Sequence, residues 1–269
     1  NHFPLSGSGS GVNTLNIAKS LAKANHEICI IMPENIPINE ELENIKIHPV
    51  YFKTKELPFN FPCFTTHPRS KTTFYELTDE EYEIYKDTFD RAIAEEINNF
   101  QPDIIHSGHI WTLSALASKY EIPLIITAHG TDLLGLQKND ERYFKDAMEA
   151  YRKSSAIIAI SEDNAKLVKE TFQGSENKVY LIPNGYDSDI FKKTGCIKEN
   201  ILKKYGITKK FKNIISFAGK FTEIKGIDTL IKAAKIYENN DILTILAGDG
   251  ELMDYMKKLL KYGTAGVRE

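Results

Sequence analysis

The strongest constraint on the fold is an alternation of short apolar runs with longer amphipathic ones. The apolar runs are rich in β-branched residues and occupy residues 27–32, 45–52, 103–106, 124–127, 156–160 and 178–182. Runs of this length and composition are typical of parallel strands that are covered on both faces. The pattern therefore indicates an α/β fold.

Helical patterns lie between these runs. Residues 12–24 carry an apolar face, and residues 79–100 place apolar side chains at steps of three and four. Thr78 and Glu81 have the spacing of a capping box at the start of the second helix. Ser161 is placed to cap a helix that runs to about residue 172. Strands that alternate with such helices predict βαβ units and a doubly wound sheet.

The alternation breaks at residues 183–211 and restarts at residue 213. Residues 183–187 have the composition of a turn, and a polar, lysine-rich stretch follows. We therefore expect an N-terminal Rossmann-like domain at residues 1–190, a linker at 191–211 and a partial C-terminal domain at 212–269, with parallel sheets in both domains. The first strand of the first domain is expected to lie before residue 1, and the second domain to be incomplete.

Composition excludes several classes of protein. The 269 residues carry a net charge of −3, and no basic stripe points to nucleic acid. Cys29, Cys63 and Cys196 lie far apart, which argues against a disulfide framework or a cysteine-rich metal site. No apolar run has the length needed to span a bilayer. We expect a cytoplasmic protein, with peripheral contact at the inner face of the membrane left open.

A glycine-flanked basic loop is the strongest functional signal. An apolar run at residues 214–218 leads into Gly219-Lys220-Phe221-Thr222-Glu223-Ile224-Lys225-Gly226, and an amphipathic run follows. Lys220 and Lys225 are thus expected at the carboxyl end of a strand, where two ammonium groups suit a diphosphate. Residues 242–251 repeat the order of strand, glycine loop and helix. The alternative is a pair of solvated lysines, since lysine is usually exposed.

A second signal is Ala128-His129-Gly130-Thr131-Asp132, which follows the apolar run at residues 124–127. Ligands of open α/β sheets bind at the carboxyl edge of the strands. His129 can hydrogen-bond a sugar hydroxyl or a phosphate there, and Gly130 lets a ligand lie against the backbone. Gly130 and Asp132 favour this function over a histidine that only caps a loop.

His106 and His109 have the spacing of a metal-binding pair. However, His106 is expected to end a strand and His109 to lie in the following loop, and no third ligand has convincing spacing. We therefore expect no metal. His109, Trp111 and Asp132 are instead candidates for the acceptor side, because an aromatic face suits a sugar face. Residues 54–71 contain three prolines and are expected to form a long loop, and long loops in compact domains are often functional.

A glycine-rich stretch, Ser6-Gly7-Ser8-Gly9-Ser10-Gly11, opens the first helix. Glycine allows a ligand to approach the backbone closely, and the start of a helix favours a negative group. The spacing is not that of the dinucleotide-binding fingerprint. The alternative is a flexible turn.

The order of these motifs resembles the retaining glycosyltransferases of family four, which have the GT-B fold of two facing Rossmann-like domains. The matching segments are residues 6–11, 21–28, 102–106, 128–132, 160–161, 182–187, 219–226 and 247–250. Each segment alone is weak evidence, whereas the ordered set is specific and covers almost the whole chain.

The resemblance implies a role for each matching residue. Gly9 and Gly11 would lie near the donor diphosphate, and His129 would contact the transferred sugar near the reacting centre. Lys220 and Lys225 would bind the diphosphate and stabilise the leaving group. The other residues that the resemblance places at the donor are Gly219, Gly248, Asp249 and Gly250, the last three near the nucleoside.

The chain departs from the family at two positions and at its ends. Lys220 stands where the family usually has arginine, so the charge is kept but the bidentate fork is lost. Asn25 stands where the family has glycine, and asparagine tolerates a left-handed turn. The family's glutamate pair would lie beyond residue 269. We therefore expect a fragment, truncated at both ends, that is inactive alone.

The resemblance implies transfer of a sugar from a nucleotide-diphosphate sugar to a hydroxyl acceptor, with retention at the anomeric carbon. The acceptor would be a saccharide, a lipid or a small metabolite. The leaving phosphate would take the acceptor proton, so neither a protein nucleophile nor a cofactor is required. Two alternatives stay open: another GT-B enzyme, such as a sugar-nucleotide epimerase or a phosphorylase, and a non-catalytic sugar- or nucleotide-binding module.

Overall fold

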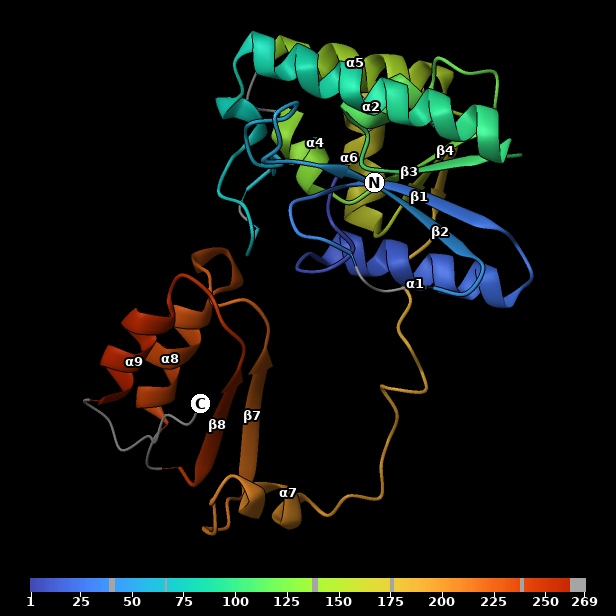
Figure 1. The fold of residues 1–269 in the computed structure, drawn as a ribbon. Coiled ribbons are helices and arrows are strands. Elements are labelled where there is room, and N and C mark those ends of the chain that lie inside the picture. Colours follow the sequence, from blue (N-terminus) through green and yellow to red (C-terminus); the bar gives the residue numbers. More distant parts are fainter. Residues whose placement is uncertain (39–41, 66, 137–139, 175–176, 238–239, 262–269) are drawn as a thin grey trace. The chain divides into compact units, whose positions relative to one another are not determined.

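The chain forms two compact units, residues Asn1–Phe191 and Lys192–Glu269, in a computed structural model (Figure 1). The structure describes residues 1–38, 42–65, 67–136, 140–174, 177–237 and 240–261. All strand pairings within named strands are parallel, which confirms the α/β class expected from the sequence.

Unit 1 contains two parallel sheets. The first pairs β1 (Ile28–Glu34) with β2 (Ile45–Tyr51), and the second has the order β3 (Ile105–Gly108), β4 (Leu124–Ala128), β5 (Ala156–Ala159) and β6 (Val179–Leu181). The described strands therefore form two sheets and not the single sheet expected. In the second sheet Gly108 pairs with Thr127, so β3 and β4 end side by side.

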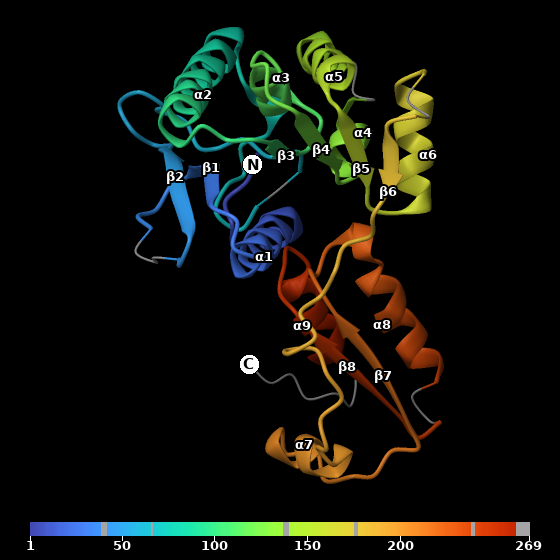
Figure 2. The ribbon, with the colours of Figure 1, turned by 90° about the vertical axis from the view of Figure 1, so that its right-hand side faces the viewer.

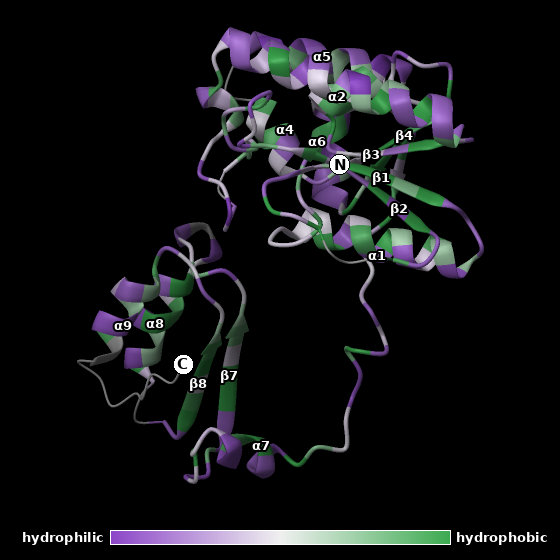
Figure 3. Ribbon diagram, in the orientation of Figure 1, coloured by the Kyte–Doolittle hydropathy of each residue, from purple (hydrophilic) through white to green (hydrophobic). Residues whose placement is uncertain are grey.

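Helices cover both faces of the first sheet. Helices α1 (Gly9–Lys23) and α2 (Asp79–Phe100) both contact β1 and β2, and they lie on opposite sides of these strands in both views (Figures 1 and 2). The other helices of unit 1 are α3 (Thr112–Ala117), α4 (Thr131–Leu136), α5 (Glu141–Lys153) and α6 (Glu162–Thr171), with a short 3-10 turn at Phe74–Glu76. The outer faces of α2 and α5 are largely hydrophilic (Figure 3).

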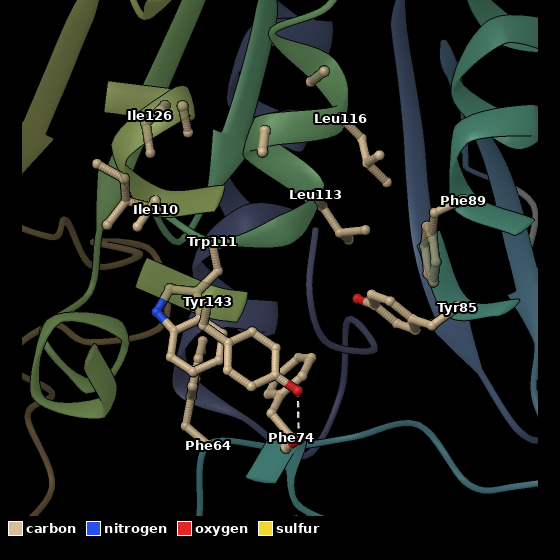
Figure 4. Packing of buried hydrophobic residues seen from close by; sticks show 14 of the residues in the cluster. Phe64, Phe74, Tyr85, Phe89, Ile110, Trp111, Leu113, Leu116, Ile126 and Tyr143 are labelled. Atoms are coloured by element: carbon tan, nitrogen blue, oxygen red, sulfur yellow. Dashed lines mark hydrogen bonds between the residues drawn. The ribbon is translucent and has the colours of Figure 1, made fainter. Parts of the chain in front are cut away.

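Aromatic side chains fill the centre of unit 1. Trp111 stacks on Tyr143 with ring centroids 4.3 Å apart, and both rings are fully buried (Figure 4). The Tyr143 hydroxyl donates a hydrogen bond to the carbonyl of Phe74. Buried aromatic side chains contribute a large part of the stabilisation that a hydrophobic core provides. This cluster joins α3, α5 and the segment before α2, and so fixes the loop that carries Trp111.

The segment at residues 54–71, expected to be a loop, has no helix or named strand among its described residues, but it packs into the core. Leu57, Phe61, Cys63 and Phe64 are all at most 4% exposed. Cys63 forms an isolated parallel bridge with Thr73. The described part of this segment therefore packs against the aromatic cluster through buried apolar side chains. The three prolines in the sequence did not predict this packing.

Unit 2 is built from helix α7 (Lys198–Lys204), strands β7 (Asn213–Ala218) and β8 (Ile242–Ala247), and helices α8 (Ile227–Ile236) and α9 (Met253–Lys261), with a 3-10 turn at Glu223–Lys225. Strands β7 and β8 form a two-stranded parallel sheet. Both strands are hydrophobic along most of their length (Figure 3). Their carboxyl ends lead into the two glycine loops, so the loops lie next to each other at one edge of this sheet.

Candidate functional site

The ends of β3 and β4 bring the loop at residue 109 and the loop at residue 129 together. The His109 N–H donates to the carbonyl of Thr127 at 2.8 Å, which continues the ladder of the two strands by one residue. The imidazole rings of His109 and His129 follow with centroids 4.6 Å apart. The sequence placed His129 at the end of a strand and His109 in a loop, but it did not predict that the two rings lie side by side.

A buried carboxylate joins these two loops. Asp132 is fully buried, and its Oδ2 accepts the Ile110 N–H at 2.9 Å while its Oδ1 accepts the His129 N–H at 3.1 Å. Burial raises the pKa of the Asp132 carboxyl, and hydrogen bonds from backbone N–H groups oppose that rise. The Trp111 indole donates to the Asp132 carbonyl at 2.9 Å. Asp132 therefore holds the loops in place and offers no surface to an acceptor, which corrects the sequence-based role.

His129 is the member of this group that reaches the surface. Its side chain is partly exposed, whereas His109 is 1% exposed and Trp111 has no exposed surface. Burial lowers the pKa of His129 to about 4, so the ring is neutral near pH 7. A neutral imidazole can both donate and accept one hydrogen bond, which suits a sugar hydroxyl.

His109 and Trp111 do not fit a direct contact with an acceptor sugar. Trp111 packs between Tyr143 and Phe64, with centroids 4.3 Å and 4.5 Å away, so its face is occupied by protein. Burial lowers the pKa of His109 well below its ordinary value. Both side chains support the loop beneath His129, and the sequence could not distinguish an aromatic residue in the core from one that faces a ligand.

His2 was not singled out from the sequence, yet it completes the histidine cluster. Its Nδ1 is 2.8 Å from the carbonyl of Gly108, to which it must donate, and its Nε2 accepts the Leu113 N–H at 3.3 Å. Its ring lies 5.5 Å from that of His109. Because both nitrogens are used, the ring is neutral with the proton on Nδ1, and burial lowers its pKa to about 3.

The glycine stretch at residues 6–11 forms the entry to α1. The Ser8 hydroxyl accepts the Gly11 N–H at 3.0 Å and caps the helix. A Cβ at Gly11 would lie 2.0 Å from the carbonyl oxygen of Pro4, so this glycine is required by packing. Gly9 is exposed, and a Cβ there would meet no atom within 4 Å. Gly9 is therefore open to a ligand, whereas the N–H of Gly11 already has an acceptor.

In unit 2 the two glycine loops are joined by their backbones. The Gly219 N–H donates to the backbone carbonyl of Ala247 at 2.9 Å, and the Phe221 N–H donates to the backbone carbonyl of Asp249 at 2.8 Å. A Cβ at Gly248 would lie 1.9 Å from the carbonyl oxygen of Gly219. Gly248 has a φ of +155°, which other residues rarely adopt. The close contact of the two loops therefore depends on glycine at this position.

Apart from Gly9 and Gly11 in unit 1, the residues expected to bind the donor lie on these joined loops or in the turn that follows them. Lys220, Lys225 and Asp249 are exposed, and Phe221 between the lysines is buried. The Gly250 N–H donates to the Asp249 carboxylate at 2.7 Å. The structure thus brings Gly219, Lys220, Asp249 and Gly250 to one edge, with Lys225 in the turn just before α8.

The positive potential at the N-terminus of α8 is partly neutralised by a nearby carboxylate. Asp228 lies in its first turn and pairs with Lys232 at 3.0 Å, a contact that lowers the pKa of Asp228. A carboxylate at this place offsets part of the positive potential of a helix start. On the glycine loops that lead to this helix, the positive charge that could attract a phosphate is carried by Lys220 and Lys225.

A cluster with metal-ligand chemistry lies elsewhere in unit 1. Ligand atoms of His48, Glu95 and Glu96 lie within 4.8 Å of one another. The buried Glu96 carboxylate already pairs with Lys46 at 2.7 Å and with His48 at 2.6 Å. These contacts already compensate the charge of Glu96 and tie α2 to β2, so we read the cluster as a structural ion-pair network.

Comparison with known proteins gives a family and several relatives. A family model described as Glycosyltransferase Family 4 matches residues 7–190. The chain is 28% identical to the uncharacterized glycosyltransferase MJ1607 of Methanocaldococcus jannaschii, over 58% of this chain and 43% of that protein. It is 31% identical to the uncharacterized glycosyltransferase MJ1178 of the same organism, over 56% of this chain and 38% of that protein. The matched region spans less than half the length of these relatives.

Solved structures agree in fold. HepE of Anabaena in complex with UDP has a TM-score of 0.65 at 15% identity, over 96% of this chain and 63% of that chain. A glycosyltransferase from Rickettsia africae has a TM-score of 0.63 at 18% identity, over 96% of this chain and 62% of that chain. At such identities the likeness shows the fold alone, which is that of the GT-B glycosyltransferases. Among the residues that the structure describes, no helix has the length and hydrophobicity to cross a membrane.

Proposed function

The chain belongs to glycosyltransferase family 4, and from this premise we propose that the protein containing it transfers a sugar from a nucleotide-diphosphate sugar to a hydroxyl acceptor, with retention at the anomeric carbon. The observation that carries the proposal is the pair of joined loops in unit 2. They combine two exposed lysines with glycines that expose the backbone. Ammonium groups pair well with phosphate oxygens, and several such contacts suit a diphosphate.

A related structure supports the class of donor. The Anabaena protein HepE has been solved with UDP, with UDP and glucose, and with UDP-glucose. Those ligands belong to HepE, which is only 15% identical to this chain. The ligands of HepE support our proposal that the donor is a nucleotide-diphosphate sugar. They do not identify the base or the sugar for this protein.

The proposed reaction exchanges one bond at the anomeric carbon for another. The bond from this carbon to the diphosphate oxygen breaks, and a bond to the acceptor oxygen forms on the same face of the sugar. The acceptor proton passes to the leaving phosphate oxygen. Lys220 and Lys225 stabilise the charge that develops on the leaving group, which is the kind of electrostatic contribution that dominates many enzymes. Neither a protein nucleophile nor a metal ion is required in this scheme.

His129 is assigned to the transferred sugar. Its ring is partly exposed, neutral near pH 7, and held by the backbone bond from its own N–H to Asp132. Hydrogen bonds from a positioned, neutral imidazole to a sugar hydroxyl orient the anomeric carbon without repelling the positive charge that develops on the sugar. The acceptor remains a saccharide, a lipid or a small metabolite.

The lysine pair can be tested by binding. In the full-length protein, Lys220→Gln and Lys225→Gln should each weaken nucleoside-diphosphate binding about 10- to 100-fold, since a hydrogen bond to a charged group contributes about 1.5–3 kcal/mol. Lys235→Gln is the matched control, because Lys235 is an exposed lysine on α8 of the same unit. Calorimetric titration gives the affinities. Equal affinity in all three variants and the wild type would refute the assignment.

A further inference from the structure

The glycine stretch of unit 1 rests on a buried imidazole that the sequence did not single out. His67 is 5% exposed, and its Nε2 lies 3.1 Å from the carbonyl oxygen of Ser6. A Cβ at Gly7 would lie 2.7 Å from Cε1 of the same ring. Gly7 also has a φ of +85°, a conformation that favours glycine. The ring and the loop are therefore in direct contact, with no room for a side chain between them.

The hydrogen bonds of His67 define its protonation. Its Nδ1 accepts the Arg69 N–H at 3.1 Å, so the proton of the neutral ring is on Nε2. Nε2 then donates to the Ser6 carbonyl. The imidazole links two segments that are 61 residues apart in the sequence, the glycine stretch and the turn at residues 67–70.

The turn that carries His67 is firmly anchored. His67 and Ser70 exchange two backbone hydrogen bonds of 2.9 Å and 3.1 Å. The guanidinium of Arg69 pairs with both oxygens of Glu34, whose side chain is almost fully buried. The Asn60 amide donates to the Arg69 carbonyl at 2.8 Å. A bidentate pair of this kind fixes orientation as well as position, so the imidazole is presented to the glycine stretch in one pose.

We propose that His67 is a positioning residue that holds the Ser6–Gly11 backbone in the conformation that receives the donor diphosphate. The proposal rests on the proposed function for its ligand, but not for the contact itself. Ser6, Gly7 and Gly9 are exposed, and the Ser6 carbonyl is held by the His67 ring. Fixing a residue's backbone costs conformational entropy. A loop that is already held loses less of this freedom when a ligand binds.

Two variants of His67 separate its two hydrogen bonds. A glutamine amide reaches the place of Nε2 and can still donate to Ser6, whereas an asparagine amide reaches only the place of Nδ1. His67→Gln should therefore keep the glycine stretch in place, and His67→Asn should release it. Lys71→Gln is the control, because Lys71 is exposed on the same segment.

Two readouts follow the variants in the full-length protein. Exchange of the Gly11 amide, whose N–H is bonded to the Ser8 hydroxyl, should become about 5- to 10-fold faster in His67→Asn, and stay within about twofold of wild type in His67→Gln and Lys71→Gln, because one hydrogen bond of about 1–1.5 kcal/mol is lost only in the first. Calorimetric titration with UDP should show a matching rise in Kd in His67→Asn alone. Rescue by glutamine is the result that a merely space-filling role would not give.

The outcomes are separable from the proposed function. If the wild type binds no nucleoside diphosphate, the proposed function fails and the exchange measurement alone decides the role of His67. Equal exchange in His67→Asn and wild type, or equal release in both His67 variants, would overturn the positioning role. A measurement on the unmodified protein guards against a variant that does not fold: the ¹⁵N shifts of His67 should show the Nε2-protonated tautomer, and the other tautomer would also overturn the proposal.

Discussion

The histidines of unit 1 show how one residue type serves different ends. His129 is partly exposed, whereas His2 and His67 are buried and both of their ring nitrogens are engaged by backbone groups. A fully engaged imidazole has a defined tautomer and cannot accept a proton without losing a bond. Because burial lowers the pKa of His2, this histidine makes the stability of unit 1 depend on pH.

His2 gives a residue-scale prediction with a definite sign. Its pKa in the folded chain is about 3, against 6.5 when unfolded. Below pH 6.5 the unfolded chain takes up a proton that the folded chain refuses, so stability is complete above pH 6.5 and falls as the pH drops toward 3. From pH 7 to pH 5 this one side chain should remove about 2 kcal/mol from the free energy of unfolding.

The measurement is urea unfolding of the 1–269 chain at pH 7 and pH 5, followed by fluorescence of Trp111, the only tryptophan. His2→Asn keeps a donor for the Gly108 carbonyl but no longer titrates, so it should lose about 2 kcal/mol less than wild type between the two values. His26→Asn removes an exposed histidine and should lose as much as wild type. An equal loss in His2→Asn and wild type would show that His2 does not resist protonation.

At the scale of elements, capping residues in the sequence correctly predicted where helices begin. Helix α2 has the bounds expected, because its capping box satisfies the backbone groups at its start. Ser161 caps α6, and Asn25 adopts the left-handed turn expected of it, with a φ of +65°. Helix α5 was not identified, although Asp140 caps it and its buried residues recur at helical spacing. That signal was present in the sequence and was missed.

Contacts between elements that are distant in the chain could not be predicted from the sequence. The pairing of His67 with Ser6 and the salt bridge of Glu34 with Arg69 join segments more than 30 residues apart. No periodicity or spacing rule encodes such contacts, because they depend on where whole elements come to lie. For the same reason the sequence placed Trp111 beside a sugar, and the structure places it in the core.

Gly248→Ala tests the joined loops of unit 2. The new Cβ would lie 1.9 Å from the Gly219 carbonyl oxygen, and alanine would have to adopt a φ of +155°. We expect a destabilisation of about 2 kcal/mol or more, since backbone strain of this kind alone costs about 1–3 kcal/mol. Hydrogen exchange of the β7 and β8 amides should accelerate accordingly.

Gly195→Ala is the control for this variant. Gly195 is exposed in the same unit, and a Cβ there would meet no atom within 4 Å. Its exchange should match that of the wild type. If Gly248→Ala also matched the wild type, the close approach of the two loops would not be a constraint in solution.

At the scale of the whole molecule, the two units differ in the cores that support them. Unit 1 has a continuous cluster of buried side chains rich in aromatic residues. Among the described residues of unit 2, the core cluster consists of Phe221, Ile227, Ile231 and Met256, and every residue of β7 and β8 remains at least partly exposed. Burial of apolar surface is the main source of stability, so unit 2 should be the weaker unit.

This difference predicts two separate thermal transitions for the 1–269 chain. Far-UV circular dichroism reports on both units, whereas fluorescence of the buried Trp111 reports on unit 1. The dichroism signal should therefore begin to fall at a lower temperature than the fluorescence changes. Unit 2 carries Lys220 and Lys225 and should unfold first. A nucleoside diphosphate at 100 times its Kd should stabilise this unit by about 2.7 kcal/mol and so raise the first transition more than the second. Coincident transitions without ligand would mean that the units unfold as one, and that the small core of unit 2 does not limit its stability.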